Sequence, residues 1–88
     1  MSDDAGTFAG VTIETNVVGR LRTVTSVREA AECLVGEWPT QGRGDHYRRA
    51  VRACHDALEG TATAAAVQRA FIRAALEAGI LVRTAERR

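Results

Sequence analysis

Alternating apolar and polar residues near the start of the chain predict two β-strands. Residues 11–15 alternate in this way and are rich in β-branched side chains, which is typical of a half-buried strand. Residues 20–24 form a second such segment, and the turn between the two ends in Gly19, which tolerates a positive φ. We therefore expect an antiparallel hairpin. Leu21 and Val24 fall on opposite faces of an unbroken strand, so a bulge or an early strand end is expected between them.

A helical period begins directly after this hairpin. Ser26 and Glu29 have the spacing of a capping box, in which the Ser26 hydroxyl accepts from the Glu29 amide and the Glu29 carboxylate reaches back to the Ser26 amide. Pro39 ends the helix, because the residue before a proline disfavours the helical conformation. Cys33 lies off the main apolar stripe, and we expect it to be a core or surface cysteine and not a metal ligand. The predicted stripe comprises Val27, Ala30, Ala31, Leu34, Val35 and Trp38.

A second helical pattern follows a loop at residues 39–44. Its N-cap is either Gly44 or Asp45, and Gly60 is a natural stop. The predicted buried stripe of this helix comprises Tyr47, Ala50, Val51, Cys54, Ala57 and Leu58.

A third helical pattern is capped by Thr61 or Thr63 and closed by Gly79. Its main stripe comprises Val67, Ala70, Phe71, Ala74, Ala75 and Ala78. Ile72 and Leu76 lie away from this stripe. An apolar arc this wide indicates either a central helix or a contact between subunits, so we take Ile72 and Leu76 as candidate interface residues.

These elements predict one α+β domain, with a two-stranded antiparallel β-hairpin packed against three α-helices in the order β-β-α-α-α. A two-stranded hairpin is marginal alone, so the helices must cover one of its faces. Residues 80–82 either dock on the core or form a short C-terminal strand. The domain is expected over residues 8–82, between a disordered N-terminal tail at residues 1–7 and a mobile basic tail at residues 83–88.

Several short motifs follow one another in a characteristic order. They are Ser26-Val27-Arg28-Glu29-Ala30-Ala31-Glu32-Cys33-Leu34, Trp38-Pro39, Arg48-Arg49-Ala50 leading to Cys54, Ala57-Leu58-Glu59-Gly60, Ala70-Phe71-Ile72 and Ala78-Gly79-Ile80. Together they resemble an uncharacterised bacterial family catalogued as domain of unknown function 982, over roughly residues 11–82. The resemblance implies a short stand-alone α+β protein. No activity or site is assigned to that family, so the resemblance implies no catalytic residue.

Chain length, net charge and the absence of long apolar runs limit the functions that we expect of this protein. A chain of 88 residues has a small core, and a partner subunit that covers apolar surface would stabilise it; we therefore expect a homodimer. The net charge of +1 makes nucleic-acid binding an unfavoured role. The chain shows neither a signal peptide nor a membrane-spanning apolar run, which indicates a cytoplasmic protein with no membrane partner and with two reduced thiols.

The charge order on the second predicted helix is unusual. Three arginines stand at its start and two acids near its end, whereas the helix dipole favours the reverse order. Glycines in the preceding loop would let an anion approach the free backbone amides. The alternative is that the arginines are offset within the fold, by Glu32 and Glu37 or by an Arg52–Asp56 pair. The candidate anion-binding residues are Arg43, Gly44, Asp45, His46, Arg48, Arg49 and Arg52.

Catalytic and metal chemistry is not indicated. The chain contains Cys33, Cys54, His46 and His55, but their spacing does not resemble that of a structural zinc site. No phosphate-binding loop, dinucleotide fingerprint or serine elbow is present. We expect no cofactor, no metal and no enzyme activity, and predict a small interaction or regulatory protein whose main partner is a second copy of itself. The first alternative is a binding module for a phosphate- or carboxylate-bearing ligand or an acidic protein, and nucleic-acid binding through the same arginines is a weaker one.

Overall fold

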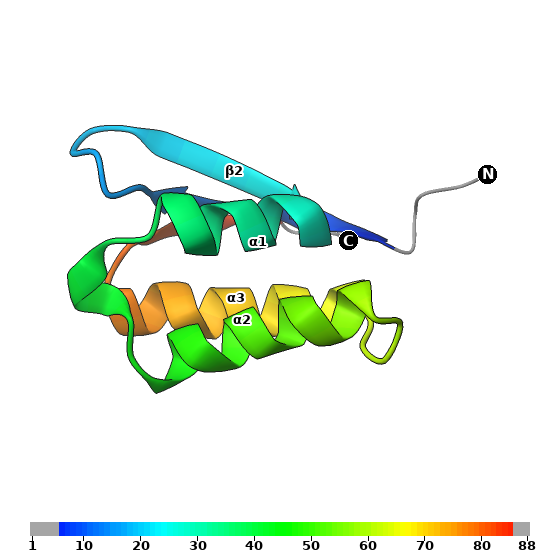
Figure 1. Ribbon diagram of the computed structural model, residues 1–88. Coiled ribbons are helices and arrows are strands. Elements are labelled where there is room, and N and C mark those ends of the chain that lie inside the picture. The colour runs from blue at the N-terminus through cyan, green and yellow to red at the C-terminus, as the bar shows by residue number, and fades with distance from the viewer. Residues whose placement is uncertain (1–5, 86–88) are drawn as a thin grey trace.

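The computed structural model describes residues 6–85, which form a three-stranded antiparallel sheet and three α-helices (Figure 1). The strands are β1 (Thr7–Glu14), β2 (Leu21–Ser26) and β3 (Leu81–Thr84), in the spatial order β2-β1-β3. The helices are α1 (Val27–Gly36), α2 (Asp45–Leu58) and α3 (Ala64–Ala78), and a 3₁₀ turn, η2 (Thr40–Gly42), precedes α2. The α+β class and the β-β-α-α-α order are confirmed, and β3 completes the sheet.

The sheet extends beyond the predicted hairpin at both ends. Strand β1 begins at Thr7, the last residue of the expected N-terminal tail, and residues 1–5 of that tail lie outside the described residues. Strand β3 runs to Thr84 and places Arg83 opposite Thr12, so the first residues of the expected C-terminal tail belong to the sheet. Residues 86–88 lie outside the described part. The unpaired edge of β1 accounts for the extra strand, because it offers backbone partners that local sequence does not reveal.

The register of the hairpin is regular where we expected an irregularity. Leu21 pairs with Glu14 and Val24 pairs with Val11, without interruption between them. Val24 is fully buried, whereas Leu21 stays 55% exposed at the edge of the sheet. The predicted bulge or strand end between Leu21 and Val24 is therefore wrong, and Leu21 is left in solvent instead. The register of the hairpin shifts further along, between Thr7 and Val11 of β1.

All three helices lie on the same side of the sheet (Figure 1). Helices α1 and α3 contact the strands, and α2 packs against α3 and α1 as a further layer. The largest fully buried side chains are Trp38, Phe71, Ile13, Leu34, Val11, Val24 and Val67. On the opposite face of the sheet the Thr12 and Thr23 hydroxyls hydrogen-bond to each other at 2.8 Å.

Helix α1 is rotated relative to the predicted stripe. Cys33 is fully buried, while Val35, predicted to be in the core, is 74% exposed. The cap also differs in part, because the Ser26 hydroxyl accepts from the Glu29 amide as expected but the Glu29 carboxylate accepts from the Thr25 amide and hydroxyl. This contact joins the first turn of α1 to the end of β2.

The other helix ends agree with the local chemistry. Gly44 is the N-cap of α2, and Thr63 caps α3 by accepting from the Ala66 amide at 3.1 Å. Gly79 ends α3 with φ 72°, in the left-handed region that glycine adopts most readily. These boundaries confirm the predicted N-caps of α2 and α3 and the stop at Gly79, whereas α1 ends at Gly36, before the predicted stop at Pro39.

Candidate functional site

The loop between α1 and α2 is held by Trp38. Its indole Nε1 donates to the Gly42 carbonyl at 3.0 Å, and its ring packs edge-on against Phe71 with centroids 5.4 Å apart. A Cβ on Gly42 would lie 2.4 Å from the Cβ of Ala78, so only glycine fits against α3. The Tyr47 hydroxyl donates to the Leu34 carbonyl at 2.8 Å, which joins the start of α2 to the end of α1.

Arg43 folds back onto this loop. Its guanidinium donates to the Trp38 carbonyl at 3.0 Å and lies over the Tyr47 ring, 5.3 Å from the ring centroid. Arg43 therefore stabilises the loop through these two internal contacts and does not join the arginines of α2.

The backbone amides at the start of α2 already bind an anion, the carboxylate of Glu77 near the end of α3. The His46 amide donates to its two oxygens at 3.1 and 3.3 Å, and the Tyr47 amide donates at 3.2 Å. Gly44 permits this approach, since a Cβ there would lie 2.7 Å from a Glu77 oxygen. The fold therefore supplies the negative charge that the helix dipole favours.

The predicted internal partners of the α2 arginines bind elsewhere. Glu37 and Glu32 pair with Arg22 of β2, at 2.6 and 3.5 Å, and the hydrogen bond from Glu37 raises the pKa of Arg22 above its ordinary value. Among residues 6–85 the expected Arg52–Asp56 ion pair does not form.

Of the three arginines on α2, Arg48 forms an ion pair, whereas Arg49 and Arg52 form none within residues 6–85. Arg48 pairs with Asp45 one turn earlier on α2. Arg49 and Arg52 make neither an ion pair nor a side-chain hydrogen bond to the described part of the chain. These four residues line an open hollow of about 520 Å³, which we call the arginine cluster. The structure thus brings Asp45, Arg48, Arg49 and Arg52 together, and places Gly44 and His46 against Glu77.

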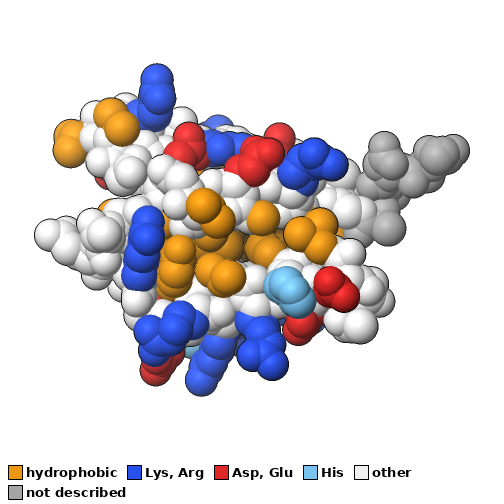
Figure 2. All heavy atoms as spheres, viewed as in Figure 1, with side chains coloured by type: hydrophobic (Ala, Val, Ile, Leu, Met, Phe, Trp, Pro, Cys, Tyr) orange, Lys and Arg blue, Asp and Glu red, His pale blue; other side chains and the backbone are white. Residues whose placement is uncertain are grey.

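A second surface feature lies in the seam between α1 and α2. Hydrophobic side chains form a band there, with charged side chains along both borders (Figure 2). The hollow at its centre measures about 190 Å³ and is almost wholly apolar; we call it the α1/α2 groove. It is lined by Ala31, Val35, Val51, Cys54, His55 and Leu58. Val35 and Leu58 are 74% and 67% exposed, which is high for aliphatic side chains on adjacent helices.

Only one of the two candidate interface residues on α3 is exposed. Ile72 is partly buried and packs against the core, while Leu76 is 61% exposed beside His46, Arg73 and Glu77. Sequence reasoning missed the groove because it counted Val35, Val51 and Leu58 as core. The available signal was the breadth of the two predicted stripes, which exceeds what one packed face can hide.

The two thiols are buried and free. Burial raises the pKa of Cys33 to about 12 and that of Cys54 to about 11, from an ordinary value of 9.0. Cys54 and His55 both line the groove, yet no hydrogen bond joins them. A high thiol pKa opposes formation of the thiolate that nucleophilic chemistry needs.

No group of three His, Cys, Asp or Glu residues within 6–85 is placed to hold a metal ion.

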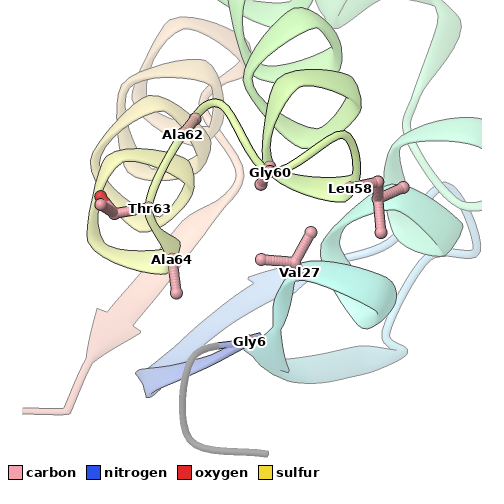
Figure 3. Close-up of a pocket in the computed structure, with 8 residues that line it drawn as sticks. Gly6, Val27, Leu58, Gly60, Ala62, Thr63 and Ala64 are labelled. Atoms are coloured by element: carbon pink, nitrogen blue, oxygen red, sulfur yellow. The ribbon is translucent and has the colours of Figure 1, made fainter.

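A further hollow, of about 500 Å³, lies where the turn between α2 and α3 meets the start of α1 (Figure 3). Val27 and Leu58 face it from α1 and α2, and Gly60 and Ala62 line it from the turn. Its lining is small and aliphatic except for Thr63, whose hydroxyl is engaged in capping α3. It therefore presents no other polar side chain that could orient a ligand.

None of the helices within residues 6–85 combines the length and the apolar character that crossing a membrane requires. Neither the curated proteins nor the solved structures include a match to this chain. The family model described as "Protein of unknown function (DUF982)" matches residues 9–82, which cover both surface features and every strand and helix core. The chain therefore belongs to this family of proteins of unknown function.

Proposed function

We propose that this protein is a small non-enzymatic interaction protein that forms a homodimer through the α1/α2 groove. The observation that carries the proposal is the exposure of Val35, Val51 and Leu58 around one apolar hollow. Covering such a patch removes apolar surface from water, which is the main favourable term in association. A chain this small gains proportionately more from that burial than a large domain does.

A non-enzymatic role is supported by the chemistry of the groove. His55 is its only titratable side chain apart from Cys54, and the pKa of Cys54 is raised to about 11. Two unpaired buried thiols also fit the reducing cytoplasm, where we place the protein.

The test is sedimentation equilibrium of the full chain with variants of matched exposure. Val35→Ser and Leu58→Ser remove exposed methyl groups from the groove, and Leu76→Ser removes similar surface from α3. We expect each groove variant to weaken dimerisation by about tenfold or more, because each change occurs in both copies, and Leu76→Ser to leave it unchanged. Strict monomers at high concentration, or a dimer sensitive only to Leu76→Ser, would contradict the proposal.

A second candidate function is anion binding at the arginine cluster. Arg49 and Arg52 have no partner in the described part of the chain, and guanidinium groups bind phosphate and carboxylate oxygens well. Phosphate titration followed by NMR should shift the side-chain Nε resonances of these arginines and leave the His46 and Tyr47 amides, which bind Glu77, unchanged. Arg49→Gln with Arg52→Gln should abolish the shifts, whereas Arg69→Gln on α3 should not. Absence of any arginine shift would exclude this candidate.

A further inference from the structure

The charges that border the α1/α2 groove are ordered along its length. Glu32 follows the groove residue Ala31 on α1, whereas Arg52 and Glu59 follow Val51 and Leu58 on α2. Because successive residues on a helix are offset by about 100°, each of these charges stands on the outer border of the apolar band. Glu32 and Glu59 are 58% and 65% exposed.

The two helices run in opposite directions, which sets the level of each charge along the groove (Figure 1). The Tyr47 hydroxyl reaches the Leu34 carbonyl at one end, and Val27 and Leu58 line the same hollow at the other. Arg28 therefore lies level with the end of α2 that carries Glu59. Glu32 lies level with the middle of α2, near Arg52.

The α1 border therefore changes from acidic at Glu32 to basic at Arg28. Over the same length of the groove, the α2 border changes from basic at Arg52 to acidic at Glu59. Basic side chains border the band along α2 near its start, and both signs appear along α1 (Figure 2). A surface of this kind is complementary to itself, provided that α1 of one copy lies over α2 of the other.

We propose that two copies pair groove to groove about a two-fold axis parallel to α1 and α2, with Glu32 opposite the partner's Arg52 and Arg28 opposite the partner's Glu59. This inference rests on the proposed homodimer and specifies its geometry. A rotation about an axis parallel to the helices places α1 over the partner's α2 at the same level. Both pairs then form twice, around a shared core of Val35, Val51 and Leu58.

The other two-fold arrangement predicts different charge pairs. An axis across the helices would place α1 over the partner's α1 in the opposite direction. Such an axis at the level of Glu32 sets like charges opposite one another, which weakens association. Midway between Glu32 and Arg28 it would set Glu32 opposite the partner's Arg28 and Arg52 opposite the partner's Glu59. Exchanging the charges of residues 32 and 52 would then restore neither pair, so the exchange distinguishes the two arrangements.

The experiment is a charge exchange measured by sedimentation equilibrium at low and high salt. Glu32→Arg and Arg52→Glu are each expected to weaken the dimer by roughly tenfold, since each reversal occurs in both copies. The double variant has the native net charge and should recover to within about threefold of the unaltered protein. Arg28→Glu, Glu59→Arg and their combination should behave in the same way. Arg69→Glu, on the exposed face of α3, controls for net charge.

Each outcome separates this inference from the proposed function. A dimer that is weakened by Val35→Ser but insensitive to the charge reversals would leave the homodimer standing and overturn the pairing. Single reversals that weaken the dimer without recovery in the double variant would also overturn it. A chain that stays monomeric at every concentration, its groove free for a different partner, would overturn both. Thermal unfolding of each variant shows that the fold is retained, which matters most for Glu32→Arg because Glu32 also contacts Arg22.

Discussion

The Glu77 carboxylate accepts a hydrogen bond from the His46 backbone amide at 3.1 Å, and so joins the end of α3 to the start of α2. This contact neutralises the amide dipoles of α2 from a distant part of the chain, whereas most helices receive that charge from a residue beside the N-cap. The first backbone amides of α2 are therefore already bound to an internal carboxylate, and the arginines of this helix do not stand beside bare amides.

Replacement of Glu77 should destabilise the protein. Glu77→Ala removes three hydrogen-bond contacts to the start of α2, and we expect a loss of about 1 kcal/mol in the free energy of unfolding, measured by urea denaturation. The vacated amides should then accept a phosphate ion, so phosphate should raise the melting temperature of Glu77→Ala more than that of the unaltered protein. An equal response to phosphate would show that Glu77 does not mask an anion site.

Gly42 and Gly36 should respond in opposite directions to alanine. At Gly42 the new methyl group would meet the Cβ of Ala78 at 2.4 Å, and we expect a loss of about 2 kcal/mol from overpacking. Gly36 is the last residue of α1 and has open space around it, so alanine there should add about 0.5–1 kcal/mol. Denaturant unfolding of both variants compares the same chemical change in two environments. A neutral Gly42→Ala would contradict the close packing of η2 against α3.

The contribution of Glu29 should depend on pH. Its hydrogen bonds to the Thr25 amide and hydroxyl lower the pKa of the carboxyl below its ordinary value of 4.5. A lowered pKa stabilises the fold above that ordinary value, and the stabilisation is lost as the pH falls through the pKa of the folded state. Glu29→Gln should therefore be less stable than the unaltered protein near neutral pH, by about 0.5 kcal/mol because solvent screens this partly exposed group. The difference should close in acid.

Ser26→Ala is the matched control for that experiment. The Ser26 hydroxyl caps α1 without ionising, so its loss should cost about 1 kcal/mol at every pH tested. A pH-independent deficit in both variants would mean that the Glu29 charge plays no part in the cap.

The thiols should resist alkylation in the folded protein. With pKa values of about 12 and 11, Cys33 and Cys54 hold far less thiolate at neutral pH than an ordinary thiol, and both side chains are buried. Iodoacetamide followed by mass spectrometry should label both slowly in buffer and both rapidly in denaturant. In dilute, monomeric protein Cys54 should be modified first, because it lines the groove, whereas Cys33 is fully buried in the core. Rapid labelling of Cys33 would contradict its placement in the core.

Local chemistry was sufficient to predict the helix caps. Which helix residues are buried depends on contacts between distant parts of the chain. Ser26, Thr63 and Gly79 act through atoms within a few residues, so the sequence around them is sufficient to identify their roles. The burial of Cys33 and the exposure of Val35 depend on how α1 is rotated against β2, which no helical period alone reveals.

The candidate site divides in the same way. The arginine-rich first turn of α2 is visible in the sequence, and Arg48, Arg49 and Arg52 do gather at one hollow. The hydrogen bonds from the His46 and Tyr47 amides to Glu77 were hidden, because Glu77 lies about thirty positions further along the chain. Strand β3 was underestimated for a similar reason, since its four residues become a strand only against the free edge of β1.

The central place of β1 has a consequence for how the protein is made. This strand leaves the ribosome before β2, and its other neighbour, β3, leaves only after all three helices. During synthesis β1 can pair with β2 alone, and one of its edges must wait for the last segment of the sheet. Pairings between such distant segments slow the closure of a fold, so we expect the pairing of β1 with β3 to be the last step by which the sheet closes.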